Sequence, residues 1–311
     1  MKIAFVFPGQ GSQSVGMLAS FAGDPTVADV VRRASDALGF DLGRLMAEGP
    51  AEELGLTINT QPCMLTAAYA MFAAWRAGGG RPPSVVAGHS LGEYTALTAA
   101  GVFTLEDAVR FVRFRAQAMQ EAVPVGVGAM AAILGLDDAQ VRAACEESAQ
   151  GEVVEAVNFN APAQVVIAGH KAAVGRACVA AKQRGAKRAV TLPVSAPFHS
   201  SLLAPACERL RERLAQVPLV APQIEVIHNV DVSSSSDPST IRETLARQAA
   251  SPVRWSETIA RMATEGVTHV VECGPGRVLS GLTKRIVGSL ESLAITDAAS
   301  LAEVRTKLAG G

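Results

Sequence analysis

The sequence lacks the features that mark several broad classes of protein. Its net charge of −1 over 311 residues gives no overall field for nucleic acid or an anionic membrane, so a charged partner would need a local patch. The five cysteines are scattered and form no C-x-x-C pair, which argues against a disulfide framework or a zinc site and favours a reducing compartment. No apolar run reaches membrane-spanning length, and the first one stops at Pro8-Gly9, too early for a signal peptide. We therefore expect a soluble cytoplasmic protein with no nucleic-acid or membrane partner.

A phosphate-binding loop is also missing. The glycine-rich stretch Pro8-Gly9-Gln10-Gly11-Ser12-Gln13 follows the first expected strand, but a G-x-G-x-x-G pattern would need glycine at position 14, which is serine. The chain also has no Gly-Lys-Ser/Thr sequence. We therefore expect no nucleotide cofactor and no metal.

What the chain does contain is a G-x-S-x-G pattern, Gly88-His89-Ser90-Leu91-Gly92. Residues 84–87 are typical of a short apolar strand and residues 93–100 of a helix, the strand-turn-helix setting of a nucleophile elbow. Glycine at positions 88 and 92 removes the Cβ atoms that would clash in so sharp a turn. The Ser90 hydroxyl is then exposed above the first amides of the helix, which can hold negative charge.

The order of expected elements predicts an α/β fold in two parts. Strands and helices alternate up to residue 125 and again from residue 197, which favours a mostly parallel, α/β-hydrolase-like sheet in a large domain formed by 1–125 and 197–311. Residues 126–196 show the order βαββαβ, which indicates an inserted small ferredoxin-like domain. The expected strands are 3–7, 84–87, 129–135, 153–158, 164–168, 188–192, 224–228 and 269–272, and the expected helices are 61–76, 93–100, 104–121, 137–148, 172–184, 202–215 and 241–250.

A serine hydroxyl is a weak nucleophile and needs a base within hydrogen-bond reach, so each of the five histidines is a candidate. His199 is the strongest, because it lies where the small domain returns the chain to the large one, and clefts form at domain junctions. His89 adjoins Ser90, but neighbours on such a turn usually point apart. The other three, His170, His228 and His269, are more typical of turn or hydrogen-bonded structural positions.

The oxyanion formed during serine attack needs hydrogen-bond donors already in place. The Leu91 backbone N–H, directly after the nucleophile, is positioned to supply one. The loop after the first strand should lie at the same carboxyl edge of a parallel sheet as the elbow. We therefore expect the side-chain amide of Gln10 to supply the second donor.

Arg115 falls on the edge of the apolar face of helix 104–121. A guanidinium near an apolar face needs an anionic partner, and its fork of donors suits a carboxylate. That carboxylate could belong to a substrate or to a protein acid that forms a structural ion pair. On sequence grounds, Gln248 is an ordinary polar helical residue and Asn160 an ordinary turn former.

Taken together, these residues resemble the malonyl-CoA:acyl carrier protein transacylase family of type II fatty acid synthesis. The similarity runs nearly end to end and is highly specific in combination. It rests on Phe7-Pro8-Gly9-Gln10-Gly11-Ser12-Gln13, Gly88-His89-Ser90-Leu91-Gly92-Glu93-Tyr94, Arg115, Asn160-Ala161-Pro162, Gln164-Val165-Val166, Val194-Ser195-Ala196-Pro197-Phe198-His199 and Glu272-Cys273-Gly274-Pro275-Gly276.

The resemblance implies a role for each matching residue. Ser90 is the acylated nucleophile, His199 its general base and Arg115 the partner of the malonyl carboxylate. The oxyanion donors are Gln10 and Leu91. No acid completes the dyad in this family, and the histidine is oriented instead by a main-chain carbonyl at the position of Gln248.

The resemblance also identifies a possible substrate pocket and leaves alternatives open. The pocket residues are His89, Asn160 and Phe198. Bacterial members often carry a smaller residue at position 198, and phenylalanine there also resembles malonyl-selective polyketide acyltransferase domains, which supports a small unbranched acyl group. A trans-acting polyketide acyltransferase, a serine thioesterase or hydrolase, and a non-catalytic docking module therefore remain alternatives. We expect a monomer whose substrates are malonyl-CoA and an acidic acyl carrier protein, docked by the cations of 182–188 or of 277–285.

Overall fold

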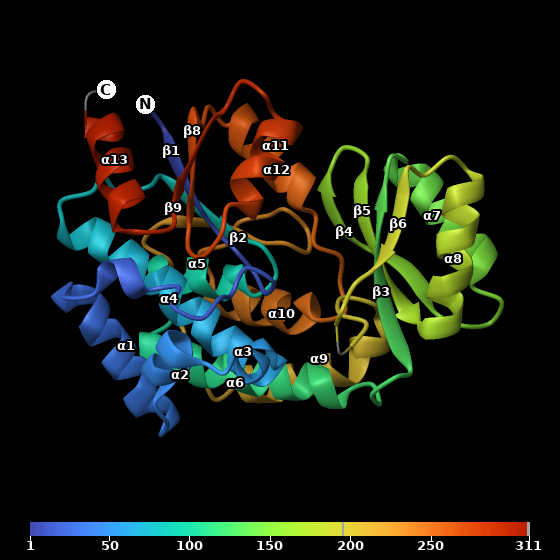
Figure 1. Cartoon of the computed structure of the whole chain (residues 1–311), viewed down its shortest axis with the longest axis horizontal. Helices are drawn as coiled ribbons and strands as arrows, with labels where there is room; N and C mark the ends of the chain where they lie inside the picture. Colours follow the sequence, from blue (N-terminus) through green and yellow to red (C-terminus); the bar gives the residue numbers. More distant parts are fainter. Residues whose placement is uncertain (195, 310–311) are drawn as a thin grey trace.

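The computed structural model describes residues 1–194 and 196–309 of the chain. Figure 1 shows a larger body that holds both termini and a smaller one beside it, each built around its own sheet. The larger sheet is parallel and the smaller one antiparallel. This arrangement confirms the fold class predicted from the sequence. Ser195, part of one matching motif, lies outside the described residues.

The larger sheet has five strands in the order β7-β2-β1-β8-β9, all parallel. The central strand is β1, every residue of which is buried, as expected for a parallel strand covered on both faces. In register, Phe7 at the end of β1 faces Gly88 at the end of β2. The strands are β1 (Ile3–Phe7), β2 (Val85–Gly88), β7 (Glu225–Ile227), β8 (His269–Cys273) and β9 (Glu291–Ile295).

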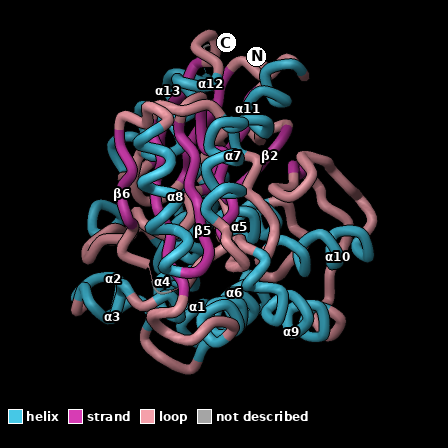
Figure 2. The backbone as a smooth tube through the Cα atoms, turned by 90° about the vertical axis from the view of Figure 1, so that its right-hand side faces the viewer, coloured by secondary structure: helices cyan, strands magenta, loops and turns pink. Residues whose placement is uncertain are grey.

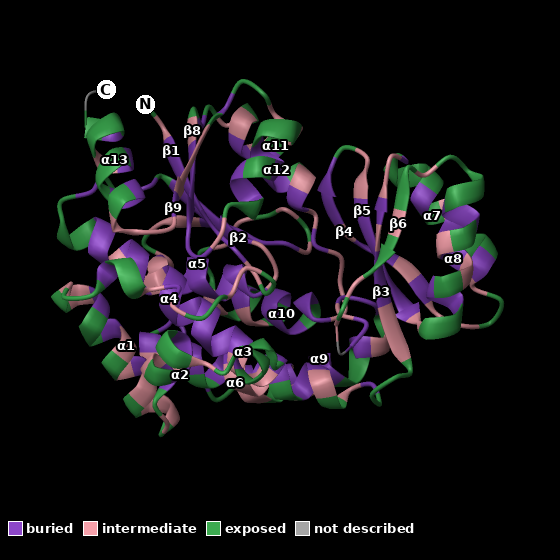
Figure 3. Ribbon diagram, in the orientation of Figure 1, coloured by how far each residue is buried: buried purple, intermediate pink, exposed green. Residues whose placement is uncertain are grey.

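Helices cover both faces of this sheet, and the residues between them form its buried interior (Figure 3). The largest core cluster lies on the side of α1, α4, α5 and α6. A second one joins the opposite face to α11 and α12. The helices are α1 (Pro25–Leu38), α2 (Leu42–Glu48), α3 (Ala51–Gly55), α4 (Thr57–Ala77), α5 (Gly92–Ala99), α6 (Leu105–Glu121), α9 (Ala204–Leu214), α10 (Pro238–Gln248), α11 (Trp255–Thr264), α12 (Val278–Ile286) and α13 (Ala298–Ala309), with short 3-10 segments at Ala19–Phe21 and Ser201–Leu203.

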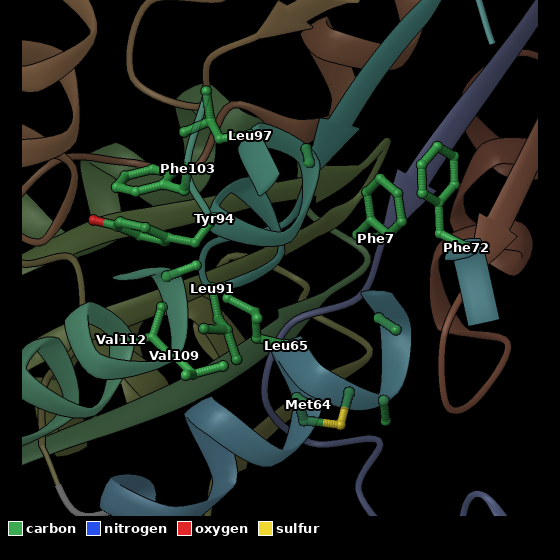
Figure 4. Packing of buried hydrophobic residues seen from close by; sticks show 14 of the residues in the cluster. Phe7, Met64, Leu65, Phe72, Leu91, Tyr94, Leu97, Phe103, Val109 and Val112 are labelled. Carbon is green, nitrogen blue, oxygen red and sulfur yellow. The ribbon is translucent and has the colours of Figure 1, made fainter. Parts of the chain in front are cut away.

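The packing of α5 against α6 fixes the geometry between the elbow and Arg115. Figure 4 shows Leu91 beside Val109 and Val112 of α6, and Tyr94 and Leu97 of α5 beside Phe103. The ring of Tyr94 stacks on that of Phe111, with centroids 5.5 Å apart. Offset stacks of this kind contribute about 0.5–1.5 kcal/mol beyond the burial of area. The helix that follows Ser90 and the helix that carries Arg115 therefore share one close-packed core.

The smaller sheet has the strand order β4-β5-β3-β6 and is antiparallel throughout. Helices α7 and α8 cover one of its faces (Figure 2). The other face carries a separate apolar cluster of Met130, Val157, Val166 and Ala168, against which Phe198 packs. The elements follow the ferredoxin-like order β3 (Gly128–Leu134), α7 (Asp138–Ser148), β4 (Val154–Ala161), β5 (Gln164–His170), α8 (Lys171–Gln183) and β6 (Arg188–Thr191).

The two sheets are joined by main-chain contacts as well as by the chain crossings. Val253, just before α11, exchanges backbone hydrogen bonds with β4: its N–H donates to Val157 and its carbonyl accepts from Phe159, at 2.8 and 3.0 Å. The division into 1–125 with 197–311, and 126–196, stays a prediction. No described helix is long and apolar enough to cross a membrane. All five cysteines are free thiols.

Candidate active site

The turn at Ser90 links β2 to α5 and is strained. The backbone φ of Ser90 is 52°, in the left-handed region that non-glycine residues seldom adopt. A Cβ on Gly92 would lie 2.1 Å from the carbonyl oxygen of Phe7, and one on Gly88 would lie 1.8 Å from the carbonyl carbon of Gly92. Both glycines are therefore required by close backbone approach, as the sequence predicted.

Asn229 clamps this turn from both sides. Its Oδ1 accepts from the Ser90 N–H at 2.7 Å, and its Nδ2 donates to the Gly88 carbonyl at 2.7 Å. The residue is fully buried and follows β7, the strand next to β2. Sequence reasoning missed Asn229. The available signal was its position, a polar residue after a strand whose end lies at the same sheet edge as the elbow.

His199 lies beside the nucleophile, and a main-chain carbonyl on the far side of its ring holds the ring in place. Its Nε2 is 2.7 Å from the Ser90 hydroxyl, and its Nδ1 is 3.0 Å from the Gln248 carbonyl. A carbonyl can only accept, so Nδ1 carries the proton and Nε2 is left as the acceptor. Gln248 is the last residue of α10, where helix carbonyls have no partner within the helix. The structure thus brings His199, Gln248 and Ser90 together.

The environment of His199 favours its neutral form. The residue is 3% exposed, and burial together with the nearby positive charge of Arg115 lowers its pKa to about 3. Both effects disfavour a second positive charge. At neutral pH the imidazole is therefore free to accept a proton from Ser90.

Arg115 reaches the nucleophile from α6. It is 1% exposed, and its Nη2 donates to the Ser90 Oγ at 3.2 Å and to the Gln248 Oε1 at 2.9 Å. Its Nη1 donates to the Gln61 Oε1 at 2.8 Å, and its guanidinium lies 5.2 Å from the Tyr94 ring centre. Within residues 1–194 and 196–309, no carboxylate forms an ion pair with it. The sequence left open an ion pair between Arg115 and a protein acid. Among the described residues, that ion pair is not formed.

The two candidate oxyanion donors line the same cavity as Ser90. Leu91 is buried at the start of α5. Gln10 is exposed, and its Nε2 donates to the Thr57 Oγ1 at 3.2 Å. The loop that carries Gln10 passes close to the elbow, because a Cβ on Gly9 would lie 2.7 Å from the His89 carbonyl oxygen.

His89 and Asn160 meet across the junction of the two sheets. The His89 Nε2 is 2.8 Å from the Asn160 Oδ1, and its ring lies 5.5 Å from that of Trp255. Burial lowers the pKa of His89. As expected, its ring is directed away from the serine. The sequence indicated a turn at Asn160, and this is wrong. Asn160 lies in β4, which continues to Ala161 because the hairpin to β5 is very short.

A cavity of about 480 Å³ contains the site between the two sheets. Ser90, His199 and Arg115 line its polar end. Apolar lining comes from Met130 and Val166 of the smaller sheet and from Leu192, Val194 and Phe198, which pack against its apolar face. A small ligand with one charged end fits this division.

Comparison with known proteins agrees with this geometry. The acyl transferase domain family model matches residues 4–305. A malonyl CoA-acyl carrier protein transacylase of Salmonella typhimurium is 53% identical over 307 residues, covering 98% of this chain and 99% of that protein. The chain belongs to the malonyl CoA-acyl carrier protein transacylase family.

Solved structures of the transacylase family have the same fold. The acyl-carrier-protein S-malonyltransferase of Burkholderia pseudomallei 1710b is 64% identical with a TM-score of 0.97, covering 98% of this chain and all of that one. A malonyl-transacylase solved in complex with its type II polyketide acyl-carrier protein is 49% identical with a TM-score of 0.97, covering 99% of this chain and all of that one.

Residues 272–276 form another of the motifs that resemble the transacylase family, and they have a structural role in this chain. The buried carboxylate of Glu272 accepts from the backbone N–H groups of Leu279 and Ser280 at 3.0 and 2.7 Å, and so caps α12. Burial raises its pKa. A Cβ on Gly274 would lie 2.8 Å from the Pro8 ring, so this stretch supports the loop that carries Gln10.

Two further site residues of this transacylase family member were missed by sequence reasoning. Gln61 is 2% exposed and holds Arg115 from α4. Glu93 is fully buried in α5 and binds the His228 Nδ1 at 2.7 Å, which agrees with a structural place for that histidine. The signal for Glu93 was a lone acid in a helix of otherwise small and apolar residues.

Proposed function

We propose that this chain transfers the malonyl group from malonyl-CoA to the phosphopantetheine thiol of acyl carrier protein through a malonyl-Ser90 intermediate. The observation that carries the proposal is a buried arginine within hydrogen-bond distance of the nucleophile and without an acidic partner among the described residues. A guanidinium fork suits the free carboxylate of a malonyl group. The names of the similar proteins support the same activity.

The first half of the reaction acylates the serine. The His199 Nε2 takes the proton of the Ser90 hydroxyl as its oxygen attacks the malonyl thioester carbon. The Leu91 N–H and the Gln10 amide stabilise the oxyanion. The Gln10 NH2 group has two donors, one of which is directed at Thr57. The carbon–sulfur bond then breaks, and His199 returns its proton to the coenzyme A sulfur. The product is an ester of malonate with Ser90.

The second half reverses these roles with a different thiol. His199 takes the proton of the phosphopantetheine thiol, and the sulfur attacks the ester carbonyl. The carbon–oxygen bond to Ser90 breaks, and the proton on His199 passes to the serine oxygen. Malonyl-CoA and the carrier protein are substrates, and none of these steps draws on a metal or cofactor.

Arg115 gives the site its selectivity in this scheme. Its ion pair with the malonyl carboxylate selects malonyl over acetyl and aligns the thioester carbonyl with the oxyanion donors. The Gln248 carbonyl fixes the tautomer of His199 but stabilises imidazolium less than a carboxylate would. The apolar wall with Phe198 favours a small unbranched acyl chain.

A serine hydrolase is the competing enzyme, since the same elbow and base also serve esterases and thioesterases. The cationic anchor beside Ser90 argues against it, because such enzymes need an apolar slot for a longer acyl chain. The pathway, fatty acid or polyketide, is left open by similarity to a transacylase of a type II polyketide carrier protein.

Intact-protein mass spectrometry after exposure to malonyl-, methylmalonyl- or acetyl-CoA tests the proposal. We expect a malonyl adduct that persists without carrier protein and disappears when carrier protein is added, with weaker labelling by the other two. The Ser90→Ala variant is the control and should show no adduct. Coenzyme A release that continues without carrier protein would identify a hydrolase, and the absence of any adduct would identify a docking module.

The same proposal includes a cytoplasmic monomer that docks an acidic carrier protein. Lys182, Lys187 and Arg188 are exposed on the smaller sheet and α8, and Lys284 is exposed on α12, which packs against β4. Arg277, at the start of α12, is also exposed. Two other cations of these groups have partners within the chain: Arg184 pairs with Glu147 at 2.6 Å, and Arg285 donates to the Pro162 carbonyl at 3.2 Å.

A further inference from the structure

Glu93 is a buried acid that the proposed reaction does not use. It lies three residues after Ser90 in α5 and is fully buried. Its Oε1 accepts from the His228 Nδ1 at 2.7 Å. Its Oε2 accepts from the Asn229 N–H at 3.1 Å and from the Gln248 Nε2 at 2.7 Å. A buried carboxylate with so many donors is held in a single position.

The side chain of Gln248 lies between this acid and the buried cation. Its Nε2 donates to Glu93 and to the Ser90 carbonyl, at 2.7 and 3.0 Å. Its Oε1 accepts from the Arg115 Nη2 at 2.9 Å. A carboxylate only accepts and a guanidinium only donates, so the amide has one permitted orientation. Glu93, the Ser90 carbonyl and Arg115 therefore fix the Gln248 amide together, and the bond to Glu93 is the shorter of the two that Nε2 donates.

We propose that Glu93 is a positioning residue that holds Arg115 in register with Ser90 through the side-chain amide of Gln248. The acid also supplies a negative charge near a buried cation without binding it directly. A direct ion pair would neutralise Arg115 with a protein carboxylate, whereas the neutral amide of Gln248 accepts from its Nη2 without cancelling the charge. The inference rests on the proposed function for the identity of the acyl group.

The Glu93→Gln variant separates this role from a structural one. Glutamine has nearly the same shape and can still accept from Gln248 and Asn229, while its NH2 group faces His228, whose other ring nitrogen can carry the proton. The charge is lost, and the hydrogen bond from the Gln248 Nε2 is now accepted by a neutral amide oxygen, which holds that end of Gln248 less firmly than a carboxylate. His228→Gln is the matched control, because it alters the other partner of Glu93 and leaves the contact to Gln248 intact.

The measurement is kcat and KM for transfer from malonyl-CoA and from acetyl-CoA, which lacks the carboxylate. For Glu93→Gln we expect KM for malonyl-CoA to rise roughly tenfold, within the range for a hydrogen bond to a charged group, and acetyl transfer to change less than about threefold. The His228→Gln variant should keep the malonyl preference of the wild-type chain. Equal losses with both acyl groups, or unchanged malonyl kinetics in Glu93→Gln, would overturn the proposal.

Gln248→Met tests the same relay if Glu93→Gln does not fold. Methionine removes both ends of the amide and keeps the main-chain carbonyl that orients His199. We expect the same loss of malonyl preference from Gln248→Met alone. Where Glu93→Gln folds, adding it to Gln248→Met should cause no further loss, because both changes break one connection. Additive losses in the double variant, or a retained malonyl preference in Gln248→Met, would contradict the relay. Failure of the proposed function is recognised separately, by a wild-type chain that forms no malonyl-Ser90 adduct.

Discussion

The Ser90 hydroxyl and the His199 Nε2 lie 2.7 Å apart, and both residues have left-handed backbones, with φ of 52° and 67°. Such conformations cost on the order of 1–3 kcal/mol each in a non-glycine residue. Neighbouring groups hold them in place. Asn229 binds both sides of Ser90, and the His199 N–H donates to the Ala249 carbonyl at 3.1 Å. The short contact between serine and histidine therefore depends on residues that do not touch the substrate.

Replacing Asn229 with alanine should release the strained turn. The Ser90 N–H and the Gly88 carbonyl would be left without partners in a buried place, at a cost of about 2–4 kcal/mol of unfolding free energy. We expect kcat to fall at least tenfold as the serine moves away from His199. Urea denaturation and steady-state kinetics measure the two effects. The Asn59→Ala control removes one exposed hydrogen bond and should change stability by less than ~0.5 kcal/mol; equal effects of the two variants would contradict the clamp.

Replacing Gly92 with alanine should destabilise the chain by at least ~3 kcal/mol, because the new Cβ would lie 2.1 Å from the Phe7 carbonyl oxygen and β1 would have to move. Gly281, within α12, has no atom within 4 Å of the corresponding Cβ position. Gly281→Ala should therefore leave stability unchanged or raise it by up to ~1 kcal/mol. Thermal or urea unfolding of both variants checks this contrast, and similar midpoints would show that the elbow does not need glycine.

Several elements of the fold could be predicted from local sequence patterns, and others could not. The strands and helices that flank the elbow have clear apolar patterns, and the βαββαβ order predicted the smaller sheet. By contrast, β9 is short and begins with exposed Glu291, so it is recognisable only from its pairing with β8. Helix α12 has no side-chain cap at its own N-cap residue, because its cap is Glu272, six residues before the helix begins.

The same distinction applies to the site. Ser90, His199 and Arg115 are identifiable from residue type and local setting, and the structure brings them together as the resemblance implied. Asn229 and Gln61 act through contacts 139 and 54 residues away in sequence, so their importance depends on which strands and helices become neighbours. For Arg115, the sequence left open whether its anionic partner is a protein acid or a substrate carboxylate. Only the packing of α4, α5 and α10 around it excludes the protein acid.

The low pKa of His199 predicts how stability and activity depend on pH. Burial and the charge of Arg115 lower the pKa to about 3 in the folded chain, below the ordinary value of about 6.5. The unfolded chain therefore binds one more proton between these values, so unfolding free energy should fall as pH drops from 6.5, by up to ~1.4 kcal/mol per pH unit. Urea unfolding of the wild-type chain and of His199→Gln at pH 7, 6 and 5 isolates this contribution; identical pH slopes would contradict it.

The activity of the histidine should follow the same logic. Because the folded pKa is lowered, the acid limb of kcat/KM should lie well below pH 6.5. Arg115→Met removes the nearby positive charge, so the pKa of His199 should rise and the acid limb should move to higher pH. Acetyl-CoA is the suitable substrate for this profile, because it has no carboxylate to lose. An unmoved acid limb in Arg115→Met would contradict the contribution of Arg115 to the low pKa of His199.

Arg115→Ala should separate carboxylate recognition from chemistry. Malonyl transfer should fall by at least about a hundredfold, as expected for the loss of a charged hydrogen-bond pair in a buried site. Acetyl transfer should fall much less, so discrimination between the two acyl groups relaxes. Competition between malonyl- and acetyl-CoA for labelling of Ser90, followed by mass spectrometry, measures this ratio. If the two rates fall equally, Arg115 has no role in carboxylate recognition.

Charge reversal distinguishes the two candidate docking surfaces for the carrier protein. The first is Lys182, Lys187 and Arg188 of the smaller sheet and α8, and the second is Arg277, at the start of α12, and Lys284 within it. Electrostatic docking should make KM for an acidic carrier protein rise with salt. Replacing the cations of the true surface with glutamate should raise that KM several-fold at low salt and flatten its salt dependence. The rate of Ser90 malonylation by malonyl-CoA should not change, since this step needs no carrier protein. If both variants keep the wild-type KM at low salt, neither surface docks the carrier protein.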